Sequence, residues 1–266
     1  MADPAATTTE KAVDCDITDG IATLTLCRPN GYNTLLGTTI AALHEQLDTL
    51  ANNPEARVIV IASTGKAFCT GHDLKEMAAN ADEDFYRQLL GDCSAMMQAI
   101  VAQPQPVIAQ VQGIATAAGC QLVATCDLAV AARSARFATN GIQNGLYCAT
   151  PAVAVGRVVS RKHALEMLLT GEFVSAERAA EIGLVNKVVE DESLAGETRM
   201  LASMIAEKSQ YAVRLGKASY YRQMSQPLDA AYRGTSEDLV CNLLSTDGQE
   251  GVKAFIEKRK PSWKDC

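Results

Sequence analysis

Two loops, each placed between an apolar strand-like run and a helix-like stretch, constrain this chain most. The first covers residues 65–77 and contains Gly71-His72-Asp73, and the second covers 111–122 and contains Thr116-Ala117-Ala118-Gly119-Cys120-Gln121. A turn from a strand into a helix leaves unpaired backbone N–H groups at the start of the helix. Two such turns brought together supply two donors for an oxyanion, which stabilises an enolate or a tetrahedral thioester adduct.

The rest of the hydrophobic pattern alternates strands with helices. Strands are predicted at 21–26, 57–62, 106–111 and 127–131. Helices are predicted at 38–51, 83–102, 161–169 and 175–182, and then without further strands at 197–208, 210–223, 227–243 and 247–258. The alternation favours an α/β fold. We expect a disordered tail over 1–12, a core over 13–196 and a C-terminal helical region over 197–266.

Composition narrows the class of function. A length of 266 residues suits one large domain, and a formal net charge of −7 argues against nucleic acid as a partner. No apolar run is long enough to span a membrane, so no membrane partner is expected. Nine cysteines without Cys-x-x-Cys pairs and only three histidines indicate reduced thiols and no metal site. Residues 1–19 contain neither an arginine nor an apolar stretch; we expect a cytoplasmic protein, with the mitochondrial matrix as the alternative.

Further segments accompany the two loops along nearly the whole chain. They lie at 21–29, 106–109, 164–171, 179–186 and 247–261. Together with the loops, they resemble the enoyl-CoA hydratase/isomerase family, also called the crotonase superfamily. The chain most resembles one subgroup of that family. The sequence variants that it shares with this subgroup are Gly71-His72-Asp73, Thr116-Ala117-Ala118-Gly119-Cys120-Gln121, Phe137-Ala138-Thr139 and Leu146-Tyr147-Cys148.

The resemblance implies a fold and a ligand. The fold is a crotonase-like ββα spiral core of the α/β class, followed by a C-terminal helical trimerisation region. A homotrimer or a dimer of trimers is therefore implied. The implied ligand is an acyl-CoA or enoyl-CoA, with coenzyme A as part of the substrate and no tightly bound cofactor. The implied activity is hydration or isomerisation of enoyl-CoA in fatty acid metabolism.

The family pattern also assigns catalytic positions. Its two oxyanion donors correspond to the backbone N–H groups of His72 and of Ala118, where relatives usually carry glycine. Its two catalytic glutamates correspond to Gln121 and Gly141. Neither residue transfers a proton as a carboxylate does, and losing such help costs about 10²- to 10⁴-fold per group. Efficient hydration is therefore not expected, and restoring both glutamates is predicted to raise the rate. The alternatives are isomerisation, thioester hydrolysis, or a binding or regulatory role with little catalysis.

Three side chains near these positions leave alternatives open. The His72 imidazole suits acid–base work near neutral pH, or it is an orienting or buried histidine. Asp73 is predicted to cap a helix that starts at Leu74 rather than to catalyse. Cys148 corresponds to the nucleophilic aspartate of the 4-chlorobenzoyl-CoA dehalogenase branch. An inert buried thiol is favoured over a reactive one, because no base is assigned beside it.

Contacts with coenzyme A follow from the same resemblance. The candidates in and around the first loop are Arg28, Ala62, Lys66, Ala67, Phe68, Gly71, Asp73 and Leu74. Phe255 and Lys258 match a C-terminal motif that reaches a neighbour's acyl-CoA in trimers. Alternatively, Lys66 is simply solvated, and Phe255 anchors an amphipathic helix to the core. Motifs for dinucleotide binding, for a P-loop and for a serine-hydrolase elbow are absent from the sequence.

Overall fold

Two β-sheets are formed within residues 11–266, which the computed structural model describes. The predicted tail over 1–12 therefore lies outside the described residues, apart from positions 11 and 12. The larger sheet has six strands in the order β1 (Val13–Thr18), β2 (Ile21–Leu26), β3 (Val58–Ser63), β5 (Val107–Val111), β7 (Leu128–Ala132) and β10 (Lys187–Val189). Within the larger sheet only β1 and β2 pair antiparallel, through a two-residue Asp19-Gly20 turn with positive φ at both positions. That geometry is the one an Asp-Gly hairpin favours.

Three of the four strands of the smaller sheet directly follow a strand of the larger one. Its order is β4 (Ala67–Cys69), β6 (Ile114–Thr116), β8 (Arg136–Ala138) and β9 (Val174–Ser175). The chain therefore contains three successive units, which begin with β3–β4, β5–β6 and β7–β8. Each unit contributes one strand to each sheet and then continues into one or two helices. These helices are α2 (Leu74–Ala79) with α3 (Glu83–Ala102), then α4 (Ala118–Thr125), and then α5 (Ala149–Val158). This repetition is a ββα spiral.

Helices cover both faces of the larger sheet, because its parallel strands are apolar on both faces. Ile59 and Ile61 of β3 belong to the main core with α1 (Gly37–Ala51) and α3. The alternate residues Val58 and Val60 pack against α8 (Leu194–Ala206) on the other face. The helix α8 thus covers the sheet, although most of it falls within the predicted C-terminal region. Two further helices, α6 (Arg161–Thr170) and α7 (Ala176–Glu181), lie beside α5 and β10.

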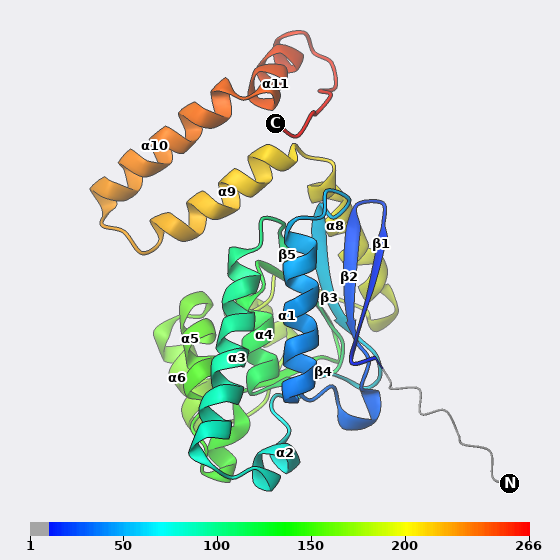
Figure 1. Cartoon of the computed structure of the whole chain (residues 1–266), viewed down its shortest axis with the longest axis vertical. Coiled ribbons are helices and arrows are strands. Elements are labelled where there is room, and N and C mark those ends of the chain that lie inside the picture. The colour runs from blue at the N-terminus through cyan, green and yellow to red at the C-terminus, as the bar shows by residue number, and fades with distance from the viewer. Residues whose placement is uncertain (1–10) are drawn as a thin grey trace, which may run out of the picture.

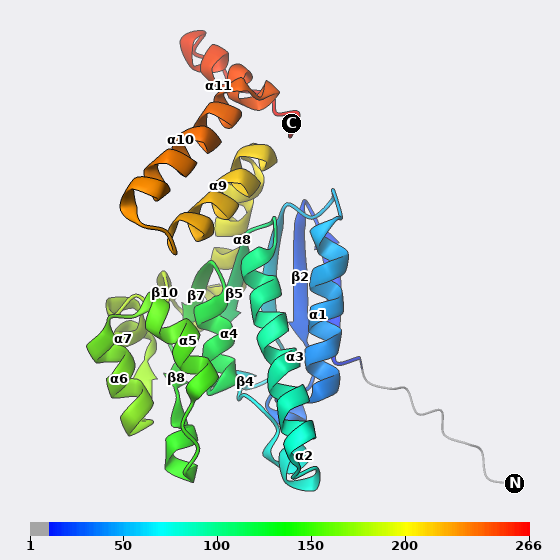
Figure 2. The same ribbon diagram turned by 60° about the vertical axis from the view of Figure 1, so that its left-hand side comes forward.

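The last three helices form an arm that projects from the core (Figures 1 and 2). This C-terminal arm consists of α9 (Gln210–Gln223), α10 (Leu228–Leu244) and α11 (Thr246–Ile256). Its helices pack on one another, and α10 lies away from the sheets in both views. The tail that follows returns to the base of the arm, where the Asp265 carboxylate accepts hydrogen bonds from Arg57 and from the Gln210 N–H.

A largely buried cluster of Lys217, Asp127 and Tyr221, here called the anchor cluster, joins the arm to the core. Lys217 Nζ lies 2.7 Å from Asp127 Oδ2 and also donates to the carbonyl groups of Ile100 and Gln105. The Tyr221 hydroxyl donates to Asp127 Oδ1 at 2.7 Å. Burial lowers the pKa of Lys217 and raises that of Tyr221. Two residues of α9 are thereby fixed to the turn between α4 and β7.

Every strand and helix range predicted from periodicity is present, with its ends shifted by only a few residues. Six strands were not predicted from the sequence. They are β1 and β10 at the edges of the larger sheet and all four strands of the smaller sheet. Three-residue strands such as β4, β6 and β8 are too short to display a period of two. Helix α5 was missed as well. The α/β class is confirmed.

Candidate functional site

The two loops meet because β4 and β6 pair in parallel, with Ala67 opposite Ile114. Parallel strands end at the same edge of a sheet, so the turns that follow them lie together. Gly71 has φ +82°, and a β-carbon there would lie 2.9 Å from the Ala117 β-carbon and 3.0 Å from Ala118 N. A β-carbon on Gly119 would lie 2.0 Å from the carbonyl oxygen of Cys69. Both glycines are therefore required for the loops to approach this closely.

Two free backbone donors lie at this junction. The His72 N–H follows Gly71, and the Ala118 N–H is the first of α4. Within residues 11–266, neither group donates to a backbone or side-chain acceptor. Unpaired backbone donors are the kind of group that a developing oxyanion requires.

The turn before α4 is held in a conformation that sequence analysis did not predict. Ala117 has φ +50° and ψ −120°, which is a region that residues with a β-carbon rarely occupy. Its N–H donates to the Ala138 carbonyl at 2.9 Å, and its carbonyl accepts from the Gln121 N–H at 3.0 Å. These bonds fix the turn, so the direction of the Ala118 N–H is set by the smaller sheet and by α4. Strained backbone of this kind is concentrated at functional sites.

The side chains of His72 and Asp73 have separate roles. Both ring nitrogens of His72 are buried and without a hydrogen-bond partner, and burial lowers the pKa of the imidazole. A neutral ring is therefore present at pH 7. Asp73 caps α2 as predicted, since its carboxylate accepts from the N–H groups of Lys75 and Glu76 at 2.9 and 3.2 Å.

Gln121, on α4, and Thr139, directly after β8, carry further unpaired polar atoms on segments that adjoin the junction. Gln121 is only 5% exposed, and its Oε1 is enclosed without a partner. Thr139 is 0% exposed, and its hydroxyl also lacks a partner. No role is predicted for Thr139 from the sequence, although the residue closes the Phe137-Ala138-Thr139 motif. Its burial depends on the pairing of β8 with β6, which no local pattern reveals.

Gly141 and Cys148, which lie apart in sequence, are in direct contact. A β-carbon on Gly141 would lie 2.9 Å from Cys148 Sγ and 2.5 Å from the carbonyl oxygen of Leu146. Burial raises the pKa of the Cys148 thiol, and the backbone of Gly141 offsets part of this effect. The thiol is therefore protonated at neutral pH. The expectation that a glutamate could be restored at position 141 is wrong for this backbone, because sulfur and a carbonyl group occupy the space.

The proposed coenzyme A contacts divide into surface and core positions. Lys66 and Leu74 are exposed, while Arg28 and Asp73 are half-buried. The side chains of Phe68, Ala67 and Ala62 are buried, and Phe68 belongs to the main core. Only the backbone of these three residues could follow a ligand. Gly71 is buried at the contact between the loops.

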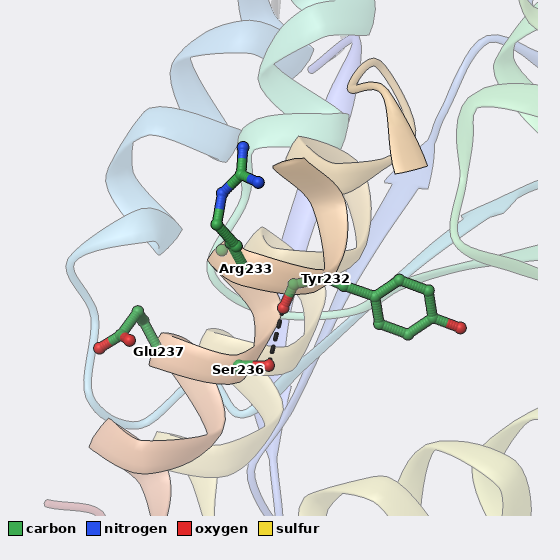
Figure 3. A pocket seen from close by; sticks show the side chains of 5 residues that line it. Tyr232, Arg233, Ser236 and Glu237 are labelled. Carbon is green, nitrogen blue, oxygen red and sulfur yellow. Dashed lines mark hydrogen bonds between the residues drawn. The ribbon is translucent and has the colours of Figure 1, made fainter. Parts of the chain in front are cut away.

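Phe255 lies in α11 and Lys258 follows shortly after that helix, so both belong to the arm that projects from the core (Figure 1). Phe255 is 85% exposed, so it is not a core anchor within a single chain. The arm also carries a shallow hollow lined by Tyr232, Arg233, Gly234, Ser236 and Glu237. Its side chains diverge, and the only hydrogen bond drawn there joins the Ser236 hydroxyl to the Tyr232 carbonyl within α10 (Figure 3). No set of polar groups converges in this hollow.

The fold and the loop junction define an α/β protein with a ββα spiral and two free backbone donors in the loops that follow β4 and β6. The sequence model described as enoyl-CoA hydratase/isomerase matches residues 16–266. The chain therefore belongs to the enoyl-CoA hydratase/isomerase family.

The subgroup indicated by the loop variants is that of enoyl-CoA hydratase domain-containing protein 3. A mitochondrial protein of that name from Xenopus laevis is 48% identical over 244 residues, covering 92% of this chain and 83% of the relative. The human protein of that name has a crystal structure that matches with a TM-score of 0.93 and 45% identity, covering 95% of this chain and 100% of that one. An enoyl-CoA hydratase structure from Mycobacterium smegmatis matches with a TM-score of 0.94 and 50% identity, over 96% and 99%. The predicted crotonase-like fold is confirmed.

Two absences complete the description of residues 11–266. No helix among them combines the length and the hydropathy needed to cross a membrane. No group of three or more histidine, cysteine, aspartate or glutamate side chains is placed to hold a metal ion there.

Proposed function

We propose that the chain binds an acyl-CoA or enoyl-CoA thioester and polarises its carbonyl through the N–H groups of His72 and Ala118. The close approach of Gly71 to the second loop carries this proposal: a β-carbon on Gly71 would lie 3.0 Å from Ala118 N, so the residue before His72 lies beside the second donor. Membership of the family supports a coenzyme A thioester as the ligand. Each well-placed donor contributes about 2.7–4 kcal/mol to the stabilisation of a developing oxyanion.

Titration calorimetry with acetyl-CoA and with a saturated long-chain acyl-CoA tests the binding. Heat of binding, and competition between the two thioesters for one site, are expected. Free coenzyme A is the matched control, because it shares the nucleotide and the pantetheine arm and lacks only the acyl group with its thioester carbonyl. No heat and no competition at millimolar thioester would contradict the proposal.

Hydration of crotonyl-CoA by the chain is expected to be slow, with kcat/KM below about 10⁴ M⁻¹s⁻¹ where an efficient enzyme reaches about 10⁶ or more. Gln121→Glu supplies one carboxylate and should raise the rate by about 10-fold or more. Gly141→Glu should not, because its side chain would meet Leu146 and Cys148. Loss of absorbance of the enoyl thioester measures all three rates. A wild-type rate in the efficient range would show that other residues perform the chemistry.

We infer that Cys148 lines the acyl site and does not act as a nucleophile. Its thiol is buried against Gly141, and its raised pKa opposes formation of a thiolate. The amide at position 121 and the protonated thiol at position 148 favour binding and polarisation of the thioester over proton transfer. A weakly catalytic acyl-CoA binder is therefore preferred to an isomerase or a thioester hydrolase.

Assembly and compartment belong to the same proposal. Apolar side chains exposed on the arm, such as Leu228, Leu244 and Phe255, support a homotrimer or a dimer of trimers in which a partner covers them. Phe255 and Lys258 would then reach a neighbour's ligand. The nine free cysteines suit a reducing compartment, either the cytoplasm or the mitochondrial matrix.

A further inference from the structure

The peptide unit that joins Gly71 to His72 is held from outside the first loop. Its N–H is the His72 donor, and its carbonyl accepts a hydrogen bond from the Leu35 N–H at 2.8 Å. A trans peptide is planar, and its N–H and C=O point in opposite directions. The Leu35 N–H therefore fixes the direction of the His72 N–H. A carbonyl that accepts a hydrogen bond also polarises its peptide unit, which strengthens the N–H of the same unit as a donor.

The His72 donor needs such an outside partner, and the Ala118 donor does not. The peptide unit of the Ala118 N–H is held within its own turn, because the Ala117 carbonyl accepts the Gln121 N–H at 3.0 Å. His72 precedes α2, which begins at Leu74, so no helical bond of that kind aligns its peptide unit. Gly71 has no β-carbon to limit rotation of this unit. The segment that contains Leu35 supplies the missing constraint.

Asn33 holds that segment in place through its side chain. Its Oδ1 accepts the Arg28 N–H at 2.8 Å, and its Nδ2 donates to the carbonyl groups of Thr64 and Ala67, both at 2.8 Å. Ala67 is the first residue of β4, the strand that leads into the first loop. Asn33 has φ +53°, a conformation that asparagine adopts more readily than most residues do. One side chain thus ties the approach to Leu35 to the strand that carries Gly71 and His72.

The residues around Leu35 follow the first loop beyond this point. Leu35 and His72 pair as an isolated parallel bridge. The Thr34 hydroxyl lies 3.1 Å from the Asp73 carboxylate, and the Gly37 N–H donates to the Glu76 carboxylate at 3.2 Å. The segment 33–37 is therefore a template along which the first loop lies.

We propose that Asn33 is a positioning residue for the first donor. It holds the Leu35 N–H on the Gly71 carbonyl, and this bond aims the His72 N–H at the thioester oxygen. Asn33 is only 1% exposed, so it acts through Leu35 and not by contact with the ligand. This inference rests on the proposed binding of a thioester at His72 and Ala118.

The backbone bond is tested by replacing Leu35 with its α-hydroxy acid, which turns the N–H into an ester oxygen and keeps the side chain. Acetyl-CoA labelled with ¹³C at the carbonyl is the probe, and isotope-edited infrared spectroscopy measures its C=O stretch. The stretch should lie lower on the wild-type chain than in water, and the ester variant should lose much of this shift. Its dissociation constant for acetyl-CoA should rise about threefold or more, while that for free coenzyme A stays unchanged.

Leu184 gives the matched control for the ester. It is a buried leucine between α7 and β10, and its N–H donates to the Ala179 carbonyl at the same distance of 2.8 Å. The same replacement there removes an equivalent bond away from the first loop. This variant should keep the wild-type stretch and the wild-type ratio of the two dissociation constants.

The role of the side chain is tested with Asn33→Asp and Asn33→Gly. The first keeps the acceptor and removes both donated bonds, and the second removes the side chain while tolerating the positive φ. Both should reduce the carbonyl shift and weaken acetyl-CoA about threefold or more relative to free coenzyme A. Gln103→Glu is the control, because Gln103 is a buried amide whose Nε2 donates to the Leu47 carbonyl at the end of α3. It should leave the ratio unchanged even where it lowers stability.

The outcomes separate this inference from the function on which it rests. Wild-type shift and affinity ratio in the Leu35 ester would overturn the control of the His72 donor by Leu35. Loss of the shift in that ester, but not in the two Asn33 variants, would overturn the role of Asn33. A wild-type chain that does not bind acetyl-CoA, or binds it without a lowered stretch, would overturn the proposed function itself.

Discussion

Replacing Lys217 by methionine lowers the free energy of unfolding by about 3–5 kcal/mol. The Lys217 and Asp127 side chains are only 7% and 15% exposed, so the substitution leaves a carboxylate buried without its cation. The carbonyl groups of Ile100 and Gln105 lose a donor at the same time. Urea denaturation followed by circular dichroism measures the change.

Two companion variants show whether burial of the charge is the cause. Adding Asp127→Asn to Lys217→Met removes the uncompensated charge and should recover part of the lost stability. Arg233→Ala breaks an exposed pair with Asp229 within the arm, and its effect should stay below about 0.5 kcal/mol. A loss below 1 kcal/mol for Lys217→Met would mean that the anchor cluster does not hold the arm to the core.

Substitution of Gly119 by alanine should separate the two loops. The new β-carbon would lie 2.0 Å from the Cys69 carbonyl oxygen, where real contacts stay above 3.0 Å, so the backbone must move. A displacement of about 1 Å at such a site costs about 100-fold in catalysis, and overpacking costs about 1–3 kcal/mol of stability. We therefore expect both weaker binding of acyl-CoA and a lower unfolding midpoint.

Gly91→Ala provides the matched control. Gly91 lies inside α3, and a β-carbon there meets nothing within 4 Å. Alanine is the better helix former, so this variant should gain about 0.5–1 kcal/mol and bind acyl-CoA as the wild type does. If Gly119→Ala kept wild-type stability and binding, the loop contact would not control the site.

The long elements were predictable because each carries its own periodic signal. The helix α1 was expected at 38–51 and spans Gly37–Ala51, with Ile40, Leu43 and Leu47 turned into the core. The loop motifs also indicated two turns from strand to helix, and α2 and α4 begin where these motifs require. Local hydrophobic spacing is sufficient for predictions of this kind.

Features that depend on distant segments were not predictable. The short strands β4 and β6, which bring the loops together, contain too few residues for a pattern. The contact of Gly141 with Cys148 arises from a bend of the intervening segment, in which the Leu146 N–H bonds to the Gly141 carbonyl. The burial of Thr139 likewise depends on its neighbours in space. The sequence around a glycine or a threonine does not indicate whether distant segments will bury it.

The contact of Gly141 with Cys148 also limits how this chain could change over evolutionary time. A single codon change toward glutamate at position 141 would introduce a side chain into space that sulfur and backbone already fill. Shortening Cys148 alone would not suffice, because the Leu146 carbonyl oxygen would still lie 2.5 Å from the new β-carbon. A descendant with two carboxylates must therefore reshape the whole 141–148 segment first, and each intermediate would have to remain stable. The packing of the 141–148 segment therefore opposes the return of a carboxylate at position 141 in this lineage.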